Sequence, residues 1–319
     1  NLYTVDDQMA PDGSFPTVYY PNPEFPEAFK LGIELAEKVS SELVVATDPD
    51  CDRVGVMAKG KDGEFHTVTG NQMGALLLDY IITAYEKEGK LPSDAYAVKS
   101  VVSANLAEKI ADAHGVKFYN VLTGFKFIGE VIKEHLAAGH GTFLLGFEES
   151  YGYLKGTYAR DKDAVVASML ICEMAAFYKA KNMTLIDALD ELFERYGYFG
   201  ERVKNIQITG LDAAGQMAKI MKGLRENSPA SLCGVKVAET RDYLDSTVRR
   251  SDGSVGETGL PKTNMLYYVL ENGDVYIVRP SGTEPKIKVY ILSQAKTREA
   301  LGAQLDALDR EADAMFSKQ

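Results

Sequence analysis

The middle of the chain alternates short apolar stretches with stretches of helical period, and this alternation restricts the fold more than any other feature. Strands are predicted at 96–98, 116–121 and 143–147, where apolar and β-branched residues gather. Helices are predicted at 106–114 and from residue 125 to Gly139, because the apolar positions recur at helical spacing and a glycine follows each stretch. Strands and helices in this order form a mostly parallel sheet that is covered on both faces.

The N-terminal side of this region combines a loop, a short sheet and one long predicted helix. The first 26 residues are rich in Pro, Asp and Gly and are predicted to form loop. The pair Asp62-Gly63 lies between two strand-like stretches, which predicts a hairpin. Residues 71–88 carry apolar side chains at helical spacing, and Gly89 ends this predicted helix.

The pattern changes at about residue 200, after two further predicted helices near 162–181 and 184–195. Asn272-Gly273 lies between two strand-like stretches, which is a strong signal for an antiparallel hairpin. The polar, Gly-rich stretch 249–260 is predicted to be a loop, and a helix is predicted from Lys296 to the end. These patterns are typical of an α+β domain.

The expected fold class is therefore α/β. Two mixed α/β sheet domains are followed by an α+β domain built on an antiparallel sheet. The length of 319 residues is compatible with two or three domains. We expect three, which cover residues 1–90, 91–199 and 200–319.

The net charge bears on the partners that the chain can bind, and the cysteines bear on its compartment. A formal net charge of -11 argues against nucleic acid and anionic membranes. The three cysteines are odd in number and widely separated, so we expect a cytoplasmic protein with no disulfide framework. No signal peptide is visible, and the most apolar helical stretch, 165–177, is too short to span a bilayer.

Residues 47–53 carry the most distinctive chemistry, with the sequence Thr-Asp-Pro-Asp-Cys-Asp-Arg. Asp48, Asp50 and Asp52 alternate after a stretch that is predicted to be a buried strand, so they lie at its carboxyl end. Carboxylates this close repel one another without a cation, and hard oxygen donors suit Mg²⁺ or Ca²⁺. Mg²⁺ usually also binds a substrate phosphate, for which Arg53 would be a charge partner. A solvated acidic turn is the alternative interpretation.

The stretch 279–286, Arg-Pro-Ser-Gly-Thr-Glu-Pro-Lys, joins two predicted strands. It offers a guanidinium, two hydroxyls and backbone N–H groups around a glycine, which suits an anion such as phosphate. The alternative is a Pro/Gly turn in which the hydroxyls act only as caps.

Two more polar segments lie in the middle domain, one after a predicted strand and one at the start of a predicted helix. Residues 148–150, Glu-Glu-Ser, could share hydrogen bonds with sugar hydroxyls, although they could also start a helix. Residues 160–163, Arg-Asp-Lys-Asp, open a predicted helix whose dipole opposes the basic side chains, a conflict that indicates function. Lys162 is therefore a candidate general acid/base with a pKa lowered by its neighbours, and Lys126 is a weaker one. The alternative for each lysine is a surface position without a role.

Together these segments resemble the α-D-phosphohexomutases. Residues 47–53, 146–152 and 279–285 resemble the metal loop, sugar loop and phosphate loop of that family, in the family's order. Residues 121–126 and 160–163 resemble two further active-site segments. The amino-acid sequence of the sugar loop is most similar to that of the phosphoglucomutase/phosphopentomutase branch. The resemblance covers essentially the whole chain.

The family has four domains, and its first domain carries a phosphorylated serine in a Thr-Ala-Ser-His-Asn-Pro-like segment. No serine of this chain is followed by His-Asn. The resemblance therefore implies the last three domains, with the second cut near its start. The missing N-terminal domain of the same protein is then an expected partner, and the chain alone is expected to be inactive.

The activity that the resemblance implies is Mg²⁺-dependent phosphoryl transfer through that serine. The parent would interconvert glucose 1-phosphate and glucose 6-phosphate, or pentose phosphates, with glucose 1,6-bisphosphate as intermediate. Mg²⁺ would bind Asp48, Asp50 and Asp52, and Arg53, Lys162 and Lys126 would be catalytic. Contacts with the substrate would come from Thr123, Gly124, Glu148, Ser150, Arg160, Arg279, Ser281, Gly282 and Thr283. A sugar-phosphate-binding module without catalysis and a Mg²⁺-dependent sugar phosphatase remain alternatives.

Overall fold

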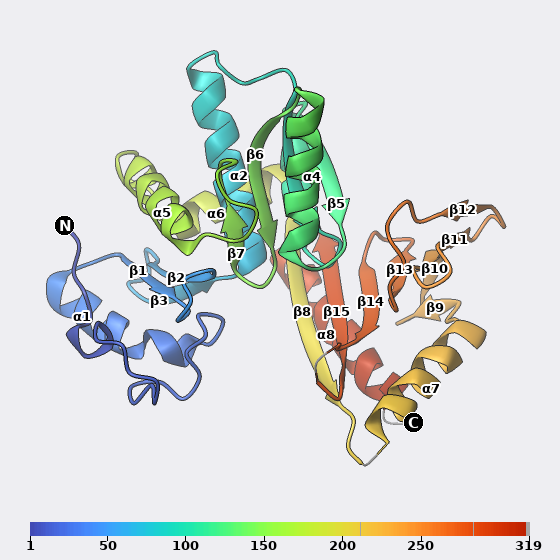
Figure 1. Cartoon of the computed structure of the whole chain (residues 1–319). Helices are drawn as coiled ribbons and strands as arrows, with labels where there is room; N and C mark the ends of the chain where they lie inside the picture. Colours follow the sequence, from blue (N-terminus) through green and yellow to red (C-terminus); the bar gives the residue numbers. More distant parts are fainter. Residues whose placement is uncertain (211, 283, 317–319) are drawn as a thin grey trace. The chain divides into compact units, whose positions relative to one another are not determined.

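The computed structural model of the chain describes residues 1–210, 212–282 and 284–316. The chain divides into two compact units, Asn1–Tyr196 and Gly197–Gln319 (Figure 1). The mixed α/β architecture agrees with the expected fold class. The further division near residue 90 remains a prediction. Among the described residues, no helix is both long enough and apolar enough to cross a membrane.

The first unit begins with residues that are mostly loop, followed by helix α1 (Lys30–Val39) and a three-stranded antiparallel sheet. The strands, in sheet order, are β1 (Leu43–Thr47), β2 (Val54–Lys59) and β3 (Phe65–Val68). The hairpin predicted at Asp62-Gly63 is confirmed as the β2–β3 connection, and Gly63 has a φ of +88° that favours glycine.

The strand before the acidic loop is less buried than predicted. Only Val44 of β1 is buried, where it packs with Phe29 and Ala36 of the region around α1. Because β1 is an edge strand of an antiparallel sheet, only part of it faces the core. The acidic loop is therefore the turn of a β1–β2 hairpin, although it does follow the carboxyl end of a strand as expected.

Helix α2 (Gly70–Lys87) leads to the parallel part of the first unit, and Thr69 and Gln72 form a capping box at its start. The sheet order is β5-β4-β6-β7, and β4 pairs in parallel with both β5 and β6. β7 adds an antiparallel edge. The strands are β4 (Ala95–Ser100), β5 (Lys117–Val121), β6 (Thr142–Glu148) and β7 (Gly152–Leu154). The predicted alternation of strands and helices is confirmed.

Helices cover both faces of this sheet. A Cβ atom on Gly146 would lie 2.6 Å from Ile128 of helix α4 (Phe125–Ala138), whereas a Cβ on Gly74 of α2 would lie 2.4 Å from Phe147. Gly146 and Phe147 are consecutive in β6 and point to opposite faces, so α4 and α2 lie on opposite sides. The remaining helices are α3 (Leu106–Ala113), α5 (Ala164–Lys179) and α6 (Leu185–Tyr196).

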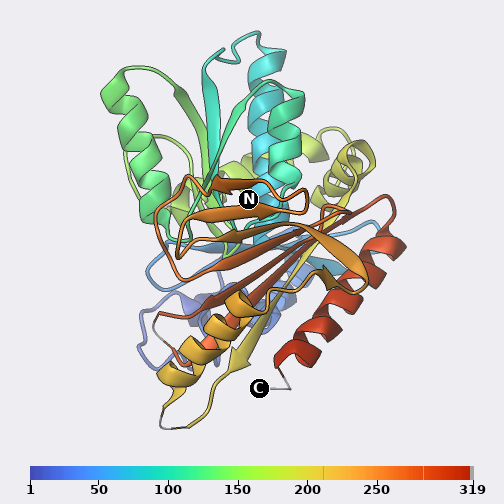
Figure 2. The ribbon, with the colours of Figure 1, turned by 90° about the vertical axis from the view of Figure 1, so that its right-hand side faces the viewer.

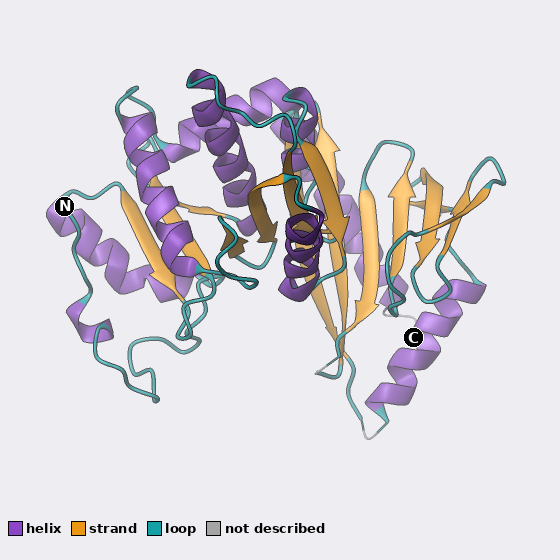
Figure 3. Cartoon of the chain, turned by 45° about the horizontal axis from the view of Figure 1, so that its top comes forward, coloured by secondary structure: helices purple, strands orange, loops and turns teal. Residues whose placement is uncertain are grey.

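Within residues 197–210, 212–282 and 284–316, the second unit forms one eight-stranded antiparallel sheet with two long helices (Figure 3). The order is β12-β11-β10-β13-β14-β15-β8, and β9 pairs with β10. The strands are β8 (Tyr198–Gln207), β9 (Ser231–Leu232), β10 (Val235–Asp242), β11 (Thr247–Arg250), β12 (Val255–Glu257), β13 (Leu266–Leu270), β14 (Val275–Pro280) and β15 (Lys286–Ala295). The hairpin predicted at Asn272-Gly273 is confirmed as β13–β14.

Helices α7 (Ala213–Glu226) and α8 (Arg298–Phe316) pack on one face of this sheet (Figure 2). Leu224 of α7 and Leu305 and Leu308 of α8 belong to the same apolar cluster as alternate residues of β14 and β15. Residues of β14 and β15 that lie between those alternate positions therefore point to the other face of the sheet.

The prediction of a loop at residues 249–260 was wrong. Strands β11 and β12 form a hairpin there, with Thr247 opposite Glu257. Its turn is closed by a hydrogen bond of 2.8 Å from the Ser254 N–H to Asp252 Oδ1, and Gly253 has a φ of +86°. Polar residues can form these strands because the hairpin lies at the edge of the sheet and is largely exposed.

Candidate active site

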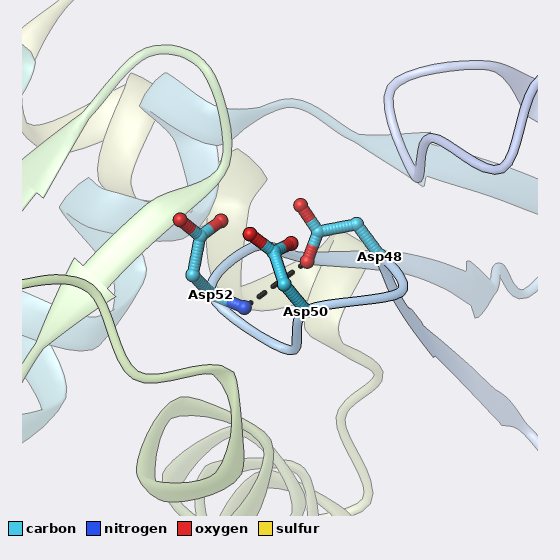
Figure 4. Close-up of side chains that lie close together, drawn as sticks. All are labelled: Asp48, Asp50 and Asp52. Atoms are coloured by element: carbon cyan, nitrogen blue, oxygen red, sulfur yellow. Dashed lines mark hydrogen bonds between the residues drawn. The ribbon is translucent and has the colours of Figure 1, made fainter.

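The three aspartates of the acidic loop come together in space. One carboxylate oxygen of each, from Asp48, Asp50 and Asp52, lies within 4.8 Å of the others (Figure 4). Asp48 Oδ1 accepts hydrogen bonds from the backbone N–H groups of Asp52 at 3.1 Å and Arg53 at 3.0 Å, which folds the loop back on itself. Asp48 is buried, with 3% of its surface exposed, whereas Asp50 is exposed. Hydrogen bonds to the Asp48 carboxylate therefore order this turn.

Arg53 stabilises the buried end of the cluster. Its Nε donates to Asp48 Oδ2 at 2.7 Å, and its Nη1 lies 3.2 Å from Glu24 Oε1. Burial raises the pKa of Asp48, but the hydrogen bonds and the charge of Arg53 outweigh burial and place that pKa below its ordinary value. The pKa of Asp52 is raised by burial and by the two neighbouring aspartates, although Lys162 opposes this.

Glu24 is a site residue that the sequence analysis missed, because residues 1–26 were interpreted only as loop. Asn22 Oδ1 accepts the Glu24 N–H at 2.9 Å and shapes the turn that carries this glutamate. The turn lies directly on β2, since a Cβ atom at Gly55 would be 2.5 Å from the Pro23 carbonyl oxygen. The Pro-Asn-Pro-Glu sequence was the available signal for a rigid turn.

Lys162 lies between two carboxylates, with its Nζ 2.9 Å from Asp52 Oδ2 and 2.9 Å from Asp161 Oδ1. Burial lowers the pKa of Lys162, but these two partners outweigh burial and raise it above its ordinary value. The expectation of a lowered pKa was therefore wrong. The local sequence shows only that basic and acidic residues alternate at 160–163. The fold adds the carboxylate of Asp52 from the acidic loop, which helps to raise the pKa of Lys162.

The expected conflict between the basic residues at 160 and 162 and a helix dipole is also absent. Helix α5 begins at Ala164, and its N-cap is Asp163, which accepts the N–H groups of Val165 and Val166 at 2.8 and 3.0 Å. The two basic side chains at 160 and 162 therefore precede the helix, because the acidic cap separates them from its first turn.

The other two basic candidates of the first unit, Arg160 and Lys126, form no ion pair with the described carboxylates. Arg160 is exposed, and its Nη1 donates to the carbonyl oxygens of Thr157 and Ala159 in its own loop. Lys126 is exposed, with its Nζ 4.9 Å from the ring centroid of Phe127, and has no ion-pair partner in the described part of the chain.

Glu148 ends β6 and connects two loops. Its Oε1 accepts a hydrogen bond of 2.7 Å from the N–H of Gly124, which has a φ of +120° that glycine tolerates. Next to it, the Thr123 hydroxyl is buried and has no hydrogen-bond partner among the residues that the structure describes. The half-buried Ser150 follows in a turn that leads into β7, so the alternative of a helix start was wrong.

Backbone contacts hold these loops of the first unit together. The N–H of Val54 donates to Tyr151 O at 3.0 Å, and the N–H of Ala164 donates to Cys51 O at 3.1 Å. The Lys162 Nζ also lies 5.7 Å from the ring centroid of Phe125, beside Gly124. Four segments of the first unit therefore meet in one place: the acidic loop and residues 123–125, 148–151 and 160–163.

The loop after β14 lies in the second unit and joins β14 to β15, as predicted. Arg279 is paired directly with Lys288, and both point away from the face that α7 and α8 cover. Ser281 Oγ accepts the Glu284 N–H at 3.2 Å, so this hydroxyl does act as a cap. Gly282 is exposed. Thr283 lies outside the described residues.

Lys288 was also missed, because its role depends on strand register. Two cations opposite each other in adjacent strands repel, so Arg279 and Lys288 together favour an anion between them.

Comparisons with known proteins agree on one family. Three models of the phosphoglucomutase/phosphomannomutase proteins match the chain: the alpha/beta/alpha domain II over residues 1–63, the alpha/beta/alpha domain III over 69–196, and the C-terminal domain over 232–311.

Relatives and solved structures extend this likeness. The chain is 35% identical to a phosphoglucomutase of Staphylococcus saprophyticus over 308 residues, which is 96% of this chain and 55% of that protein. It is 37% identical to a phosphoglucomutase of Staphylococcus epidermidis over 290 residues, 90% of this chain and 52% of that protein. The chain thus spans about half the length of these curated relatives.

The fold is similar to that of the crystallised phosphoprotein pp63/parafusin (a phosphoglucomutase) from Paramecium in its open form. The two share a TM-score of 0.63 and 20% sequence identity over 92% of this chain and 50% of that one. Motifs, fold and relatives all lead to the same conclusion: the chain belongs to the α-D-phosphohexomutase family, the phosphoglucomutases and phosphomannomutases.

Proposed function

We propose that this chain supplies the metal-, sugar- and phosphate-binding parts of a phosphosugar mutase that interconverts glucose 1-phosphate and glucose 6-phosphate. The observation that carries the proposal is the meeting of four loops of the first unit around three carboxylates, Arg53 and Lys162. The staphylococcal relatives are named as phosphoglucomutases, which favours glucose phosphates over pentose phosphates.

The carboxylate cluster fits a divalent cation. Three carboxylates offer hard oxygen donors within 4.8 Å of one another, which suits Mg²⁺. Asp48, Asp50 and Asp52 would hold the ion. When bound, Mg²⁺ would offset the negative charge on a phosphoryl group during its transfer. Arg53, restrained by Asp48 and Glu24, would place its guanidinium beside the same phosphoryl group.

Lys162 is the proposed proton donor and acceptor at the sugar oxygen. Its ammonium pairs with Asp52 of the acidic loop and lies 5.7 Å from the ring centroid of Phe125. Its aliphatic stem packs on Gly152, so Lys162 contacts both the metal loop and the sugar loop. The raised pKa keeps this group protonated near neutral pH, which suits the donation of a proton to a sugar oxygen. Lys126 and Arg160 are proposed in supporting roles only.

Sugar recognition is assigned to the neighbouring loops. The carboxylate of Glu148 is oriented by the Gly124 N–H and can accept hydrogen bonds from sugar hydroxyls, with Ser150 as a second contact. The buried Thr123 hydroxyl supports this proposal, because a buried polar group without a partner costs about 1–3 kcal/mol, which a ligand hydroxyl would recover. The phosphate that does not react would bind Arg279, Ser281 and Lys288, with Gly282 and Thr283 in the same loop.

The whole reaction requires a phosphorylated serine, with glucose 1,6-bisphosphate as the intermediate, and the chain carries no Ser-His-Asn segment. Transfer through a nucleophile needs that nucleophile in line with the substrate oxygen. We therefore propose that activity depends on a domain carrying such a serine, and that the parent enzyme acts in the cytoplasm, as the cysteine usage indicates.

The test is a coupled assay of glucose 1-phosphate conversion with Mg²⁺ and glucose 1,6-bisphosphate. We expect residues 1–319 alone to bind the sugar phosphate without converting it, and a version extended by a serine-bearing domain to convert it. Robust conversion by residues 1–319 alone would contradict the dependence on the serine. Release of inorganic phosphate in place of isomerisation would instead support a sugar phosphatase.

A further inference from the structure

Asp52 is the carboxylate of the acidic loop that pairs with a lysine from another loop. Asp52 Oδ2 lies 2.9 Å from the Lys162 Nζ, and Asp52 Oδ1 is 3.7 Å from the Arg53 Nε. By contrast, Asp48 uses Oδ1 for two backbone N–H groups and Oδ2 for the Arg53 guanidinium. Lys162 is thus the close charge partner of Asp52.

A divalent ion at the cluster would need the same carboxylate. A metal ion bound to Asp52 and an ammonium hydrogen-bonded to Asp52 would lie within a few ångströms of each other and repel. The repulsion is strong here because the side chains of Lys162 and Asp52 are only 17% and 30% exposed, which limits screening by water. Simultaneous occupation of Asp52 is therefore unfavourable.

The lysine has a second carboxylate within reach. Asp161 Oδ1 lies 2.9 Å from the Lys162 Nζ and also accepts the backbone N–H of Lys162 at 2.8 Å. The aliphatic stem packs on Gly152, where a Cβ atom would lie 2.3 Å from the Lys162 Cδ. The ammonium can thus leave Asp52 by a small rotation about its last bonds and keep one charge partner, while the stem stays in place.

We propose that Lys162 and a divalent cation compete for Asp52, so that binding of the cation transfers the ammonium from Asp52 to Asp161 alone. This inference rests on the cation site of the proposed function. It means that the group that moves the proton becomes available only when the cation that assists phosphoryl transfer is bound. Through the single carboxylate of Asp52, the chain would thereby couple binding of the cation to release of the lysine that moves the proton.

The experiment is a double-mutant cycle on Mn²⁺ binding to the purified chain, read from the free-Mn²⁺ electron paramagnetic resonance signal near neutral pH. The four proteins are wild type, Lys162→Met, Asp52→Asn and the double variant. We expect Lys162→Met to tighten Mn²⁺ binding by about tenfold, since direct partners couple strongly. In the Asp52→Asn background the same change should alter the affinity by less than about twofold.

Controls separate competition from a general effect of charge. Lys133→Met removes an exposed lysine of α4 in the same unit and should change Mn²⁺ affinity by less than about twofold. Lys162→Gln keeps a polar head group and should tighten binding in the same direction as Lys162→Met. Circular dichroism establishes that each variant is folded.

An unchanged affinity in both Lys162 variants, or an equal gain with and without Asp52, would overturn the competition. In that case a wild-type chain that still binds Mn²⁺ leaves the proposed function intact. Failure of Mn²⁺ to bind any of the four proteins would overturn the cation site and the competition together.

Discussion

The Nε of Arg53 donates a hydrogen bond of 2.7 Å to Oδ2 of Asp48, and the backbone N–H of Arg53 donates to Oδ1 of the same carboxylate. One residue therefore satisfies both oxygens of the buried aspartate. This pairing orders the β1–β2 turn and leaves Asp50 and Asp52 as the more accessible carboxylates of the cluster.

The pairing predicts how acid affects stability. The pKa of Asp48 in the folded chain lies below its ordinary value of 3.8, so the ionised form stabilises the fold. This contribution is present above pH 3.8 and is lost as the pH falls through the folded pKa. Asp48→Asn should cost roughly 1–3 kcal/mol of unfolding free energy near neutral pH, because a buried charge-assisted contact is lost.

Urea unfolding at a series of pH values checks this expectation. The difference between wild type and Asp48→Asn should shrink below pH 3.8. Asp50→Asn, in the same loop but exposed, is the control and should unfold like wild type throughout. A difference that is independent of pH would show that Asp48 acts through packing and not through its charge.

Asp50 should matter for cation binding and little for stability. Its carboxylate is exposed, and it lies within 4.8 Å of its two neighbours. Asp50→Asn removes one hard anionic ligand, and we expect at least about a tenfold loss of Mg²⁺ affinity by calorimetry. Glu34→Gln, an exposed acid on α1, has the same change of charge and should leave the affinity within about twofold. Equal losses in both variants would indicate non-specific attraction.

The basic pair at the second-unit loop should dominate phosphate binding. Arg279→Ala removes a charge-assisted contact, and should weaken glucose 1-phosphate binding by about 1.5–3 kcal/mol in calorimetry. Lys288→Met should weaken it in the same direction. Arg249→Ala is the matched control, since Arg249 is an exposed arginine of the β11–β12 hairpin in the same unit. Unchanged affinity in the Arg279 variant would exclude this loop as the phosphate site.

The turn that carries Glu24 should depend on Gly55. A Cβ atom at Gly55 would lie 2.5 Å from Pro23 O and 2.9 Å from the Phe29 ring, so Gly55→Ala forces the turn off β2. We expect a loss of roughly 1–3 kcal/mol in urea unfolding. Gly13→Ala is the control, because no atom lies within 4 Å of its added Cβ, and it should be neutral. A neutral Gly55→Ala would mean that the turn is not held on the strand.

Sequence patterns predicted most of the fold because they act over short distances. Helical spacing and the glycine after residues 71–88 identified α2, and Asn272-Gly273 identified the β13–β14 hairpin. The same reasoning failed at 249–260, where polar residues were interpreted as a loop. An edge hairpin needs no apolar face, so its strands carry no periodic signal.

The candidate site was only partly predictable for a related reason. The three aspartates and Arg53 are neighbours in sequence, so their grouping could be read directly. Glu24 and Lys288 could not, because Glu24 meets Arg53 from a separate turn of the first unit, and Lys288 lies opposite Arg279 in the second unit only through strand register. The shift of the Lys162 pKa was predicted in the wrong direction, since the carboxylate that reverses it comes from another loop.

The sequence by itself determined the order of most strands and helices, the position of the acidic loop, residues 148–150 and the loop after β14 at strand ends, and the family to which those loops belong. These properties follow from side-chain periodicity, turn residues and motifs that span a few positions. Only the tertiary structure decided that Lys162 pairs with Asp52 and that Gly124 orients Glu148. Such pairs form when separate loops pack together, and the free energy of each contact depends on burial and distance that no local pattern encodes.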